Sequence, residues 1–246
     1  MAIDLSGTDA LTRKAVAHYW RTLELQGARN RNAGSNADRG ARAAVTGGRQ
    51  MDGFCELIRY VLLGVGLTDG DIYLDRELEL PGYFRPTKKW DMLVVQGGVL
   101  LAAMEFKSQR GPSFGNNFNN RSEEAVGTAQ DLATAFREGA FGKHGIRPWA
   151  GWVMLLEECD RSTQVVGVAE PHFKVFGEFR DASYMRRYEL LLRKLVLEKL
   201  YDSSAFLVAT ESGGPTGEFR EPATDLTMKK FLGGLAGHIG GYLAGK

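Results

Sequence analysis

One stretch near the middle of the chain constrains the fold more than any other. Residues 90–95 and 99–106 are two apolar runs, the first rich in β-branched residues, separated by the turn sequence Gln96-Gly97-Gly98. This pattern predicts two neighbouring strands joined as a hairpin. The remaining segments must then cover the sheet that contains it.

Charged residues interrupt this predicted hairpin at few places. Asp91 stands at the start of the first strand, and Glu105 and Lys107 stand at the end of the second. Because side chains alternate across a strand, Glu105 and Lys107 share one face while Phe106 points to the other. If the strands pair through the turn, Asp91 comes close to both. Two carboxylates and a lysine are costly to place at the edge of an apolar sheet unless they have a use.

These residue types favour a magnesium site. Mg²⁺ binds through one or two carboxylates together with phosphate and water, lowers the pKa of a bound water, and offsets charge on a reacting phosphate. Lys107 would orient or help deprotonate the water, or hold the phosphate as a point charge. The spacing D-x13-E-x-K resembles the PD-(D/E)xK nuclease motif, with Trp90 where that motif often has Pro. An E-x-K triplet is common, so a salt-bridged strand end is the simpler explanation of the triplet alone.

Two further metal ligands are candidates. Asp52 and Glu56 are four residues apart on a predicted helix and therefore share a face. If that helix packs near the sheet, Glu56 could join Asp91 and Glu105, although such a pair is more often simply exposed. The backbone carbonyl of Phe106, between Glu105 and Lys107, is the second candidate.

Composition limits the classes of function. With 246 residues, 43% of them hydrophobic, we expect one domain over residues 1–246 with a proper core. The net charge is +1, so a protein that binds nucleic acid would have to concentrate its positive charge locally. Two distant cysteines fit a reducing cytoplasm. No run approaches about 18 apolar residues and no signal peptide is recognisable, so we expect a soluble, non-exported protein with no membrane partner.

Hydrophobic periodicity predicts the other elements. Helices are expected at residues 8–26, 51–63, 120–138, 183–200 and 225–243, and further strands at 71–80, 148–157, 165–168 and 205–209. Gly27 is expected to end the first helix, Asn120 and Glu123 to open the third, and Asp181 to cap the fourth. The expected fold is α/β, with a mixed central sheet flanked by helices.

Two polar segments are candidates for contact with DNA. Residues 28–50 carry five arginines against one acid, which predicts a flexible loop, either a plain surface loop or an arm that orders on a phosphate backbone. Residues 108–121 are rich in Gly, Pro and Asn, which predicts a loop that contacts phosphates or base edges, or one whose Asn side chains fix its own shape. The candidate DNA contacts are Arg39, Arg42, Arg110, Asn116, Asn117, Asn119 and Arg121.

Several longer sequence segments are more specific than the D-x13-E-x-K spacing. They are EFKSQRGPSFGNNFNNRSEEAVG at 105–127, AVTGGRQMDGF at 44–54, ELPGYFRPTKKWDMLVV at 79–95, EPHF at 170–173 and ASYMRRYELLLRKLV at 182–196. Over nearly its whole length the chain resembles the XhoI-type family of type II restriction endonucleases.

This resemblance implies a restriction-endonuclease-like core of the PD-(D/E)xK type, a homodimer, and Mg²⁺-dependent cleavage of both strands of double-stranded DNA. The implied site is the palindrome 5′-CTCGAG-3′, cut after the first C to leave 5′ overhangs. By motif position, Asp91, Glu105 and Lys107 are the implied catalytic set. A bacterial, cytoplasmic enzyme of this kind implies a cognate DNA methyltransferase in the host, though not as a stable subunit.

Two alternatives remain open from the sequence. A structure-specific nuclease of the same fold, acting in repair or junction resolution, would cut branched DNA in preference to a plain duplex. A DNA-binding protein that has lost cleavage would keep the fold, but the intact Asp91, Glu105 and Lys107 argue against it.

Overall fold

The computed structural model describes residues 5–32, 49–142 and 145–246. In chain order the elements are α1 (Thr8–Asn32), η1 (Arg49–Met51), α3 (Asp52–Val65), η2 (Asp69–Asp71), β1 (Ile72–Tyr73), β2 (Glu79–Pro81), β3 (Thr87–Lys89), β4 (Met92–Gln96), β5 (Val99–Gln109), α4 (Phe114–Arg137), β6 (Trp149–Glu157), α5 (Asp160–Thr163), η3 (Gly177–Phe179), α6 (Tyr184–Leu197), β7 (Ser203–Ala209), η4 (Gly214–Thr216) and α7 (Met228–Ala244). None of these helices is long and apolar enough to cross a membrane.

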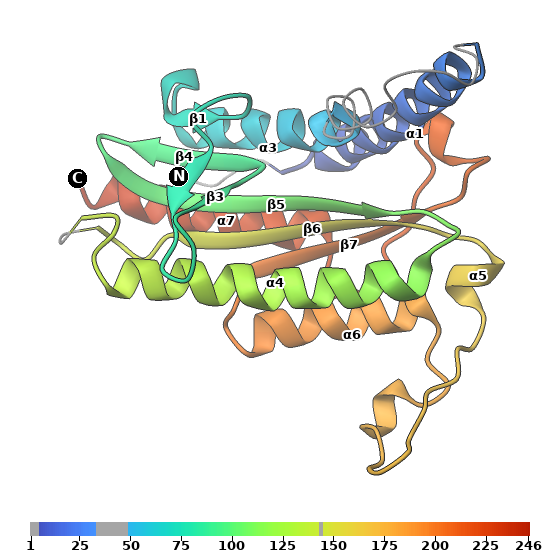
Figure 1. Cartoon of the computed structure of the whole chain (residues 1–246). Helices are drawn as coiled ribbons and strands as arrows, with labels where there is room; N and C mark the ends of the chain where they lie inside the picture. The colour runs from blue at the N-terminus through green and yellow to red at the C-terminus, as the bar shows by residue number, and fades with distance from the viewer. Residues whose placement is uncertain (1–4, 33–48, 143–144) are drawn as a thin grey trace.

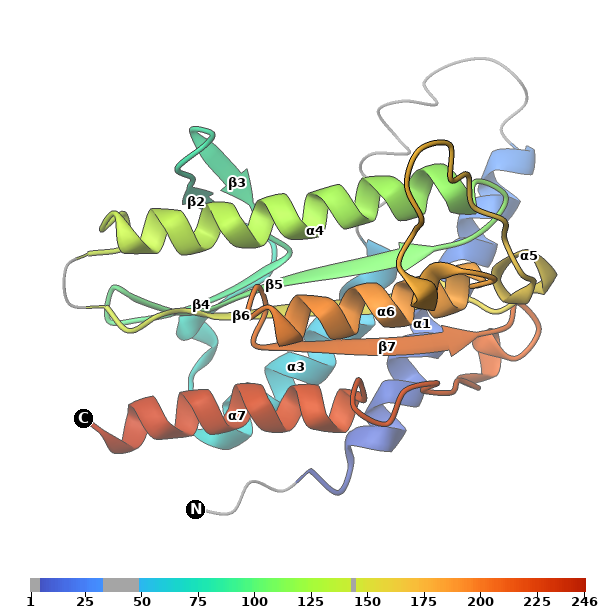
Figure 2. The same cartoon turned by 90° about the horizontal axis from the view of Figure 1, so that it is seen from below.

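The described elements form a mixed sheet covered on both faces by helices, which confirms the predicted fold class (Figure 1). The main sheet has the strand order β1-β4-β5-β6-β7 within the described residues. β1, β4 and β5 pair antiparallel, whereas β5, β6 and β7 pair parallel. α4 and α6 pack on one face, and α1, α3 and α7 pack on the other (Figure 2).

The predicted hairpin is present as β4 and β5. Gly97 and Gly98 both have positive φ, 59° and 78°, as a tight turn of type I′ requires and as glycine allows without steric cost. Met92 lies opposite Met104, so the register brings Asp91 beside Glu105 in the interior of β5. β5 is buried on both faces, with Ala102, Met104 and Phe106 in one core and Leu100 and Ala103 in the other.

The start of α4 differs from the prediction. The helix begins at Phe114 rather than near Asn120, so the Asn-rich segment is its first two turns and not a loop. Phe114 stacks on Tyr184 at 5.8 Å and Phe118 meets Tyr188 edge-on at 5.1 Å, centroid to centroid. A buried Phe contributes about 1.5–3 kcal/mol, several times the ~0.7 kcal/mol that a helical Asn costs relative to Ala. The two anchors, four residues apart, thus hold one side of the run against α6 despite its poor helix propensity.

The first helix is also longer than predicted. α1 continues through Gly27, which keeps helical backbone, as far as Asn32. Residues 28–32 are thus helical and not part of a flexible loop. Residues 33–48, with Arg39 and Arg42, lie outside the described residues, so the prediction for them stands untested.

Two predicted strands and two helix ends need correction. Residues 71–80 hold the short strands β1 and β2, which belong to different sheets. Residues 165–168 are not a strand, because Arg187 donates hydrogen bonds to the carbonyls of Val166 and Gly167. The cap of α6 is Ser183, which accepts a hydrogen bond from the Arg186 N–H, and not Asp181. α7 runs from Met228 to Ala244, so its start lies three residues after the predicted one.

Candidate active site

The β4–β5 hairpin brings Asp91, Glu105 and Lys107 together. The Asp91 N–H donates to the Met104 carbonyl at 3.2 Å, and Asp91 Oδ2 accepts a hydrogen bond from the Phe106 N–H at 2.7 Å. Lys107 Nζ lies 3.7 Å from Asp91 Oδ2 and forms an ion pair with Glu105 Oε2. Backbone pairing therefore fixes the acid of one strand beside the acid and the lysine of the other.

Burial changes sharply across these three residues. The Glu105 side chain is 0% exposed, that of Lys107 is 12% exposed, and that of Asp91 is 41% exposed. The cluster thus runs from the interior to the surface, with Asp91 at its outer end. A fully buried carboxylate is tolerated where cations compensate its charge, and Lys107 is one such cation.

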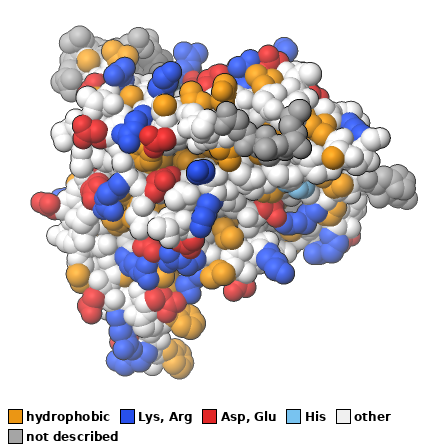
Figure 3. Space-filling model, turned by 180° about the vertical axis from the view of Figure 1, so that it is seen from behind, with side chains coloured by type: hydrophobic (Ala, Val, Ile, Leu, Met, Phe, Trp, Pro, Cys, Tyr) orange, Lys and Arg blue, Asp and Glu red, His pale blue; other side chains and the backbone are white. Residues whose placement is uncertain are grey.

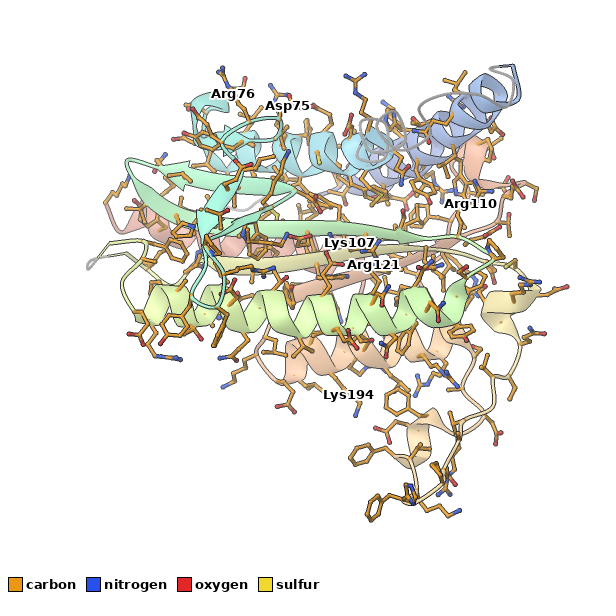
Figure 4. All side chains as sticks on the ribbon, in the orientation of Figure 1. Asp75, Arg76, Lys107, Arg110, Arg121 and Lys194 are labelled. Atoms are coloured by element: carbon orange, nitrogen blue, oxygen red, sulfur yellow. The ribbon has the colours of Figure 1, made fainter. Side chains whose placement is uncertain are left out.

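Two more residues complete the cluster, and the sequence analysis did not assign either of them to it. Lys88 on β3 pairs with the other oxygen of Glu105, Oε1. Glu124 on α4 accepts from Lys107 at 3.0 Å and from Arg121 at 2.6 Å. Figure 4 shows Lys107 and Arg121 together between β5 and α4. Neither contact could be predicted from the sequence, because Lys88 and Glu124 reach β5 from elements that dock on the sheet through long-range packing.

The β2–β3 hairpin, which carries Lys88, is clamped onto α4. Asp131 Oδ1 accepts hydrogen bonds from the N–H groups of Tyr83 and Phe84, at 2.7 and 2.9 Å, and Oδ2 accepts from Arg85 Nε at 2.7 Å. A Cβ at Gly82 would lie 2.7 Å from both the Arg85 carbonyl oxygen and Asp131 Oδ2, so the turn requires glycine there. This clamp fixes the turn of the hairpin whose second strand carries Lys88.

The pKa values follow from burial and from these pairings. Burial raises the pKa of Glu105, and Lys107 offsets this effect only in part. Burial acts to lower the pKa of Lys107, but the charges of Glu105, Asp91 and Glu124 outweigh it and raise that pKa. Lys107 is therefore a cation at neutral pH in this arrangement. Burial would raise the pKa of Glu124, but Lys107 and Arg121 hold it below its usual value.

The residues present fit a magnesium ion. Glu105 Oε2 is buried and, within the described structure, accepts no hydrogen bond of good geometry although the Lys107 ammonium lies beside it. Carboxylate oxygens are hard ligands of the kind Mg²⁺ prefers. No group of three or more His, Cys, Asp and Glu side chains that could hold a metal occurs among the described residues. Asp91 and Glu105 would thus leave positions for phosphate and water, as Mg²⁺ sites usually do.

A ligand role for Glu56 stays a prediction. Glu56 on α3 is 63% exposed and pairs with Arg59 at 3.4 Å. Phe106 does lie between Glu105 and Lys107, with its N–H bonded to Asp91. A ligand role for its carbonyl stays a prediction.

The candidate DNA-contact residues that the structure describes lie at different distances from the Asp91–Glu105–Lys107 cluster. Arg121 borders the cluster, and Asn117, four residues earlier on α4, shares its flank of the helix. Asn116 is exposed, and Asn119 donates to Glu123 at 2.8 Å. Arg110 pairs with Glu211 at 3.1 Å where β5 ends near α1, apart from Lys107 and Arg121 (Figure 4).

Comparison with known proteins gives a consistent result. The family model described as "Restriction endonuclease XhoI" matches residues 29–221, which contain the whole cluster. The chain is 51% identical over 210 residues to the type II restriction enzyme BstVI of Geobacillus stearothermophilus, covering 83% of this chain and 93% of that protein. It is 49% identical over 202 residues to the type II restriction enzyme XhoI of Xanthomonas vasicola, covering 80% and 79%.

A third relative is the type II restriction enzyme AbrI of Azospirillum brasilense. It is 47% identical over 175 residues, which cover 71% of this chain and 78% of that protein. No solved structure matches the chain. The family match and the identities, over most of each chain, lead to one conclusion: the chain belongs to the XhoI family of restriction endonucleases.

Proposed function

We propose that this chain is a type II restriction enzyme that cuts both strands of DNA at 5′-CTCGAG-3′, after the first C, in a reaction that needs Mg²⁺. Its similarity to three proteins named type II restriction enzymes supports the class of enzyme. The observation that carries the proposal is the buried Glu105, paired with two lysines beside Asp91. Replacing such a charge cluster with apolar residues often leaves stability unchanged or increased, which favours a catalytic reason for keeping it.

In the proposed reaction, Asp91 and Glu105 would hold Mg²⁺ beside the scissile phosphate. When bound, Mg²⁺ supplies an activated water and neutralises charge on the phosphate. Lys107 is a cation held by three carboxylates, so it places positive charge beside the reacting phosphate. These contacts favour a role for Lys107 as a point charge rather than as a base. In-line attack of water on phosphorus would break the bond to the 3′ oxygen, which leaves as a hydroxyl after taking up a proton, while the water oxygen stays on the 5′ phosphate.

The proposed partners follow from the palindrome. Two strands related by a two-fold axis call for two copies of one active site, so a homodimer on double-stranded DNA is the economical assembly. Base readout is assigned to side chains that reach the major groove, with Arg121 and Asn117 the candidates nearest the cluster. In a bacterial cytoplasm, a separate methyltransferase would protect the same site in the host genome.

The proposal is tested by digestion of two plasmids that differ by one base pair within a single CTCGAG. We expect linear product from the intact site, with four-base 5′ overhangs, and none from the altered plasmid. EDTA should abolish cutting, and adding back Mg²⁺ in excess should restore it. A fixed cutting pattern at another sequence would remove the assigned specificity, and preference for a branched substrate over both plasmids would favour the structure-specific nuclease.

A further inference from the structure

Lys88 is part of the wall of the site rather than a surface lysine. Its side chain is only 16% exposed, and its ammonium pairs with Glu105 Oε1 and donates to the Lys89 carbonyl. The same ammonium lies 5.4 Å from the centroid of the Trp90 ring, within range of a cation–π contact. Three contacts with neighbouring groups therefore hold it over the catalytic carboxylate.

This arrangement conflicts with metal binding at Glu105. The carboxylate is fully buried, and each of its oxygens faces a lysine, Lys88 at Oε1 and Lys107 at Oε2. A cation that binds Glu105 must displace one of the two ammonium groups, because like charges repel strongly at short range in a buried site.

The ion pairs indicate which lysine gives way. Moving the Lys107 ammonium away from Glu105 would also break its ion pairs with Glu124 at 3.0 Å and Asp91 at 3.7 Å. Lys88 has no carboxylate partner other than Glu105 among the ion pairs of the described residues. Displacing Lys88 therefore breaks one ion pair, whereas displacing Lys107 breaks three, so Lys88 is the ammonium that gives way.

A displaced Lys88 needs another anion, since a largely buried cation without a partner is costly. The nearby acids are already committed, Asp91 to the metal and Glu124 to Lys107 and Arg121. The anion that arrives together with the metal is a phosphate of the DNA backbone. Lys88 lies next to Glu105, one of the two carboxylates proposed to hold that metal.

We propose that Lys88 is a further active-site residue, which neutralises Glu105 before the metal binds and then holds a phosphate of the strand that is cut. This inference rests on the proposed nuclease function. It makes metal and DNA enter the site together, because the ammonium is displaced at low cost only when phosphate is present to receive it.

The test compares Lys88→Met with Lys89→Met in the full chain. Lys89→Met is the matched control, because this substitution removes the same charge from the same strand at an exposed position. Two quantities are measured: the affinity for Mn²⁺ alone, without DNA, by paramagnetic resonance of free Mn²⁺, and the single-turnover rate of cleavage of a CTCGAG duplex.

For Lys88→Met we expect Mn²⁺ binding tighter on the order of tenfold, because a competing cation is gone. We expect its cleavage to be slower by roughly 10²-fold, because a charge on the phosphate is lost. Lys89→Met should keep the metal affinity of the unaltered protein, and Lys88→Arg should regain part of the cleavage rate. Thermal unfolding checks that each variant is folded, and Lys88→Gln replaces Lys88→Met if the latter is not.

Unchanged Mn²⁺ affinity with unchanged cleavage in the folded Lys88 variant would overturn the proposal and leave Lys88 a structural partner. If the unaltered protein cuts no duplex at all, the nuclease function fails instead. The Mn²⁺ comparison needs no cleavage and still shows whether Lys88 competes for Glu105, so the two failures are distinguishable.

Discussion

Each charged side chain at the candidate site has a specific partner, and the partners come from three separate elements. Lys88 comes from β3, Glu105 and Lys107 from β5, and Glu124 from α4. The sequence placed Asp91, Glu105 and Lys107 together because strand alternation and a two-glycine turn are local rules. It could not place Lys88 or Glu124, because their contacts depend on how the second hairpin and α4 dock on the sheet.

Asp131 shows how one residue holds the hairpin that carries Lys88. Burial acts to raise the pKa of Asp131, but hydrogen bonds from Phe84, Arg85 and Tyr83 outweigh it and lower that pKa. A lowered pKa means that the carboxylate stabilises the folded state above the ordinary Asp pKa of about 3.9, and that this stabilisation is lost as the pH falls through the folded-state value.

We therefore expect Asp131→Asn to lower the free energy of unfolding at pH 7 by about 1–3 kcal/mol. The difference from the unaltered protein should shrink as the pH is lowered below about 4. Urea unfolding across this pH range measures it, with Asp75→Asn, at an exposed position (Figure 4), as the control. A difference that stays constant with pH would contradict the role of the carboxylate charge.

Among the elements, those governed by apolar pattern were predicted and those governed by long-range packing were not. β4, β5, β6 and β7 lie close to their expected ranges because each is a short apolar run that the sheet buries. The beginning of α4 was missed because the polar composition of its first turns concealed Phe114 and Phe118, whose partners Tyr184 and Tyr188 are far along the chain. A four-residue spacing of aromatic residues was the available signal.

The anchoring of α4 gives a prediction at this scale. Phe118→Ala should destabilise the protein by about 1–3 kcal/mol, since Phe118 is half-buried and loses its edge-on contact with Tyr188. Amide hydrogen exchange should become faster in residues 114–120 than in the rest of α4. Val126→Ala, on the exposed side of the same helix, is the matched control and should change neither quantity appreciably. Equal exchange along α4 in both variants would show that Phe118 does not anchor the first turns.

Across the whole molecule, charge is balanced. The net charge is +1, and the face shown in Figure 3 carries Lys and Arg side chains interspersed with Asp and Glu. Affinity for DNA must therefore come from local groups around the active site rather than from an overall positive field. Fold class and the central hairpin were predictable from the sequence, whereas the surface that joins two copies was not, because it depends on shape.

The assembly itself is testable. One chain has a mass of 27.1 kDa, and we expect two chains to bind one CTCGAG duplex. Analytical ultracentrifugation of the protein with a short duplex, in EDTA to prevent cutting, measures the stoichiometry. A single chain on each duplex at concentrations well above the dissociation constant would contradict the two-fold assembly.

Glu105, buried between two lysines, is the proposed catalytic metal ligand, and the most direct test is cleavage of a single-site plasmid in Mg²⁺ by Glu105→Gln. Glu123→Gln on α4 is the control, because Glu123 is exposed and bonds Asn119 rather than the cluster. We predict a folded Glu105→Gln protein whose cutting is reduced by at least roughly 10³-fold, since it loses a charged metal ligand, while the control linearises the plasmid normally. A Glu105→Gln protein that cuts CTCGAG as fast as the control would contradict the account.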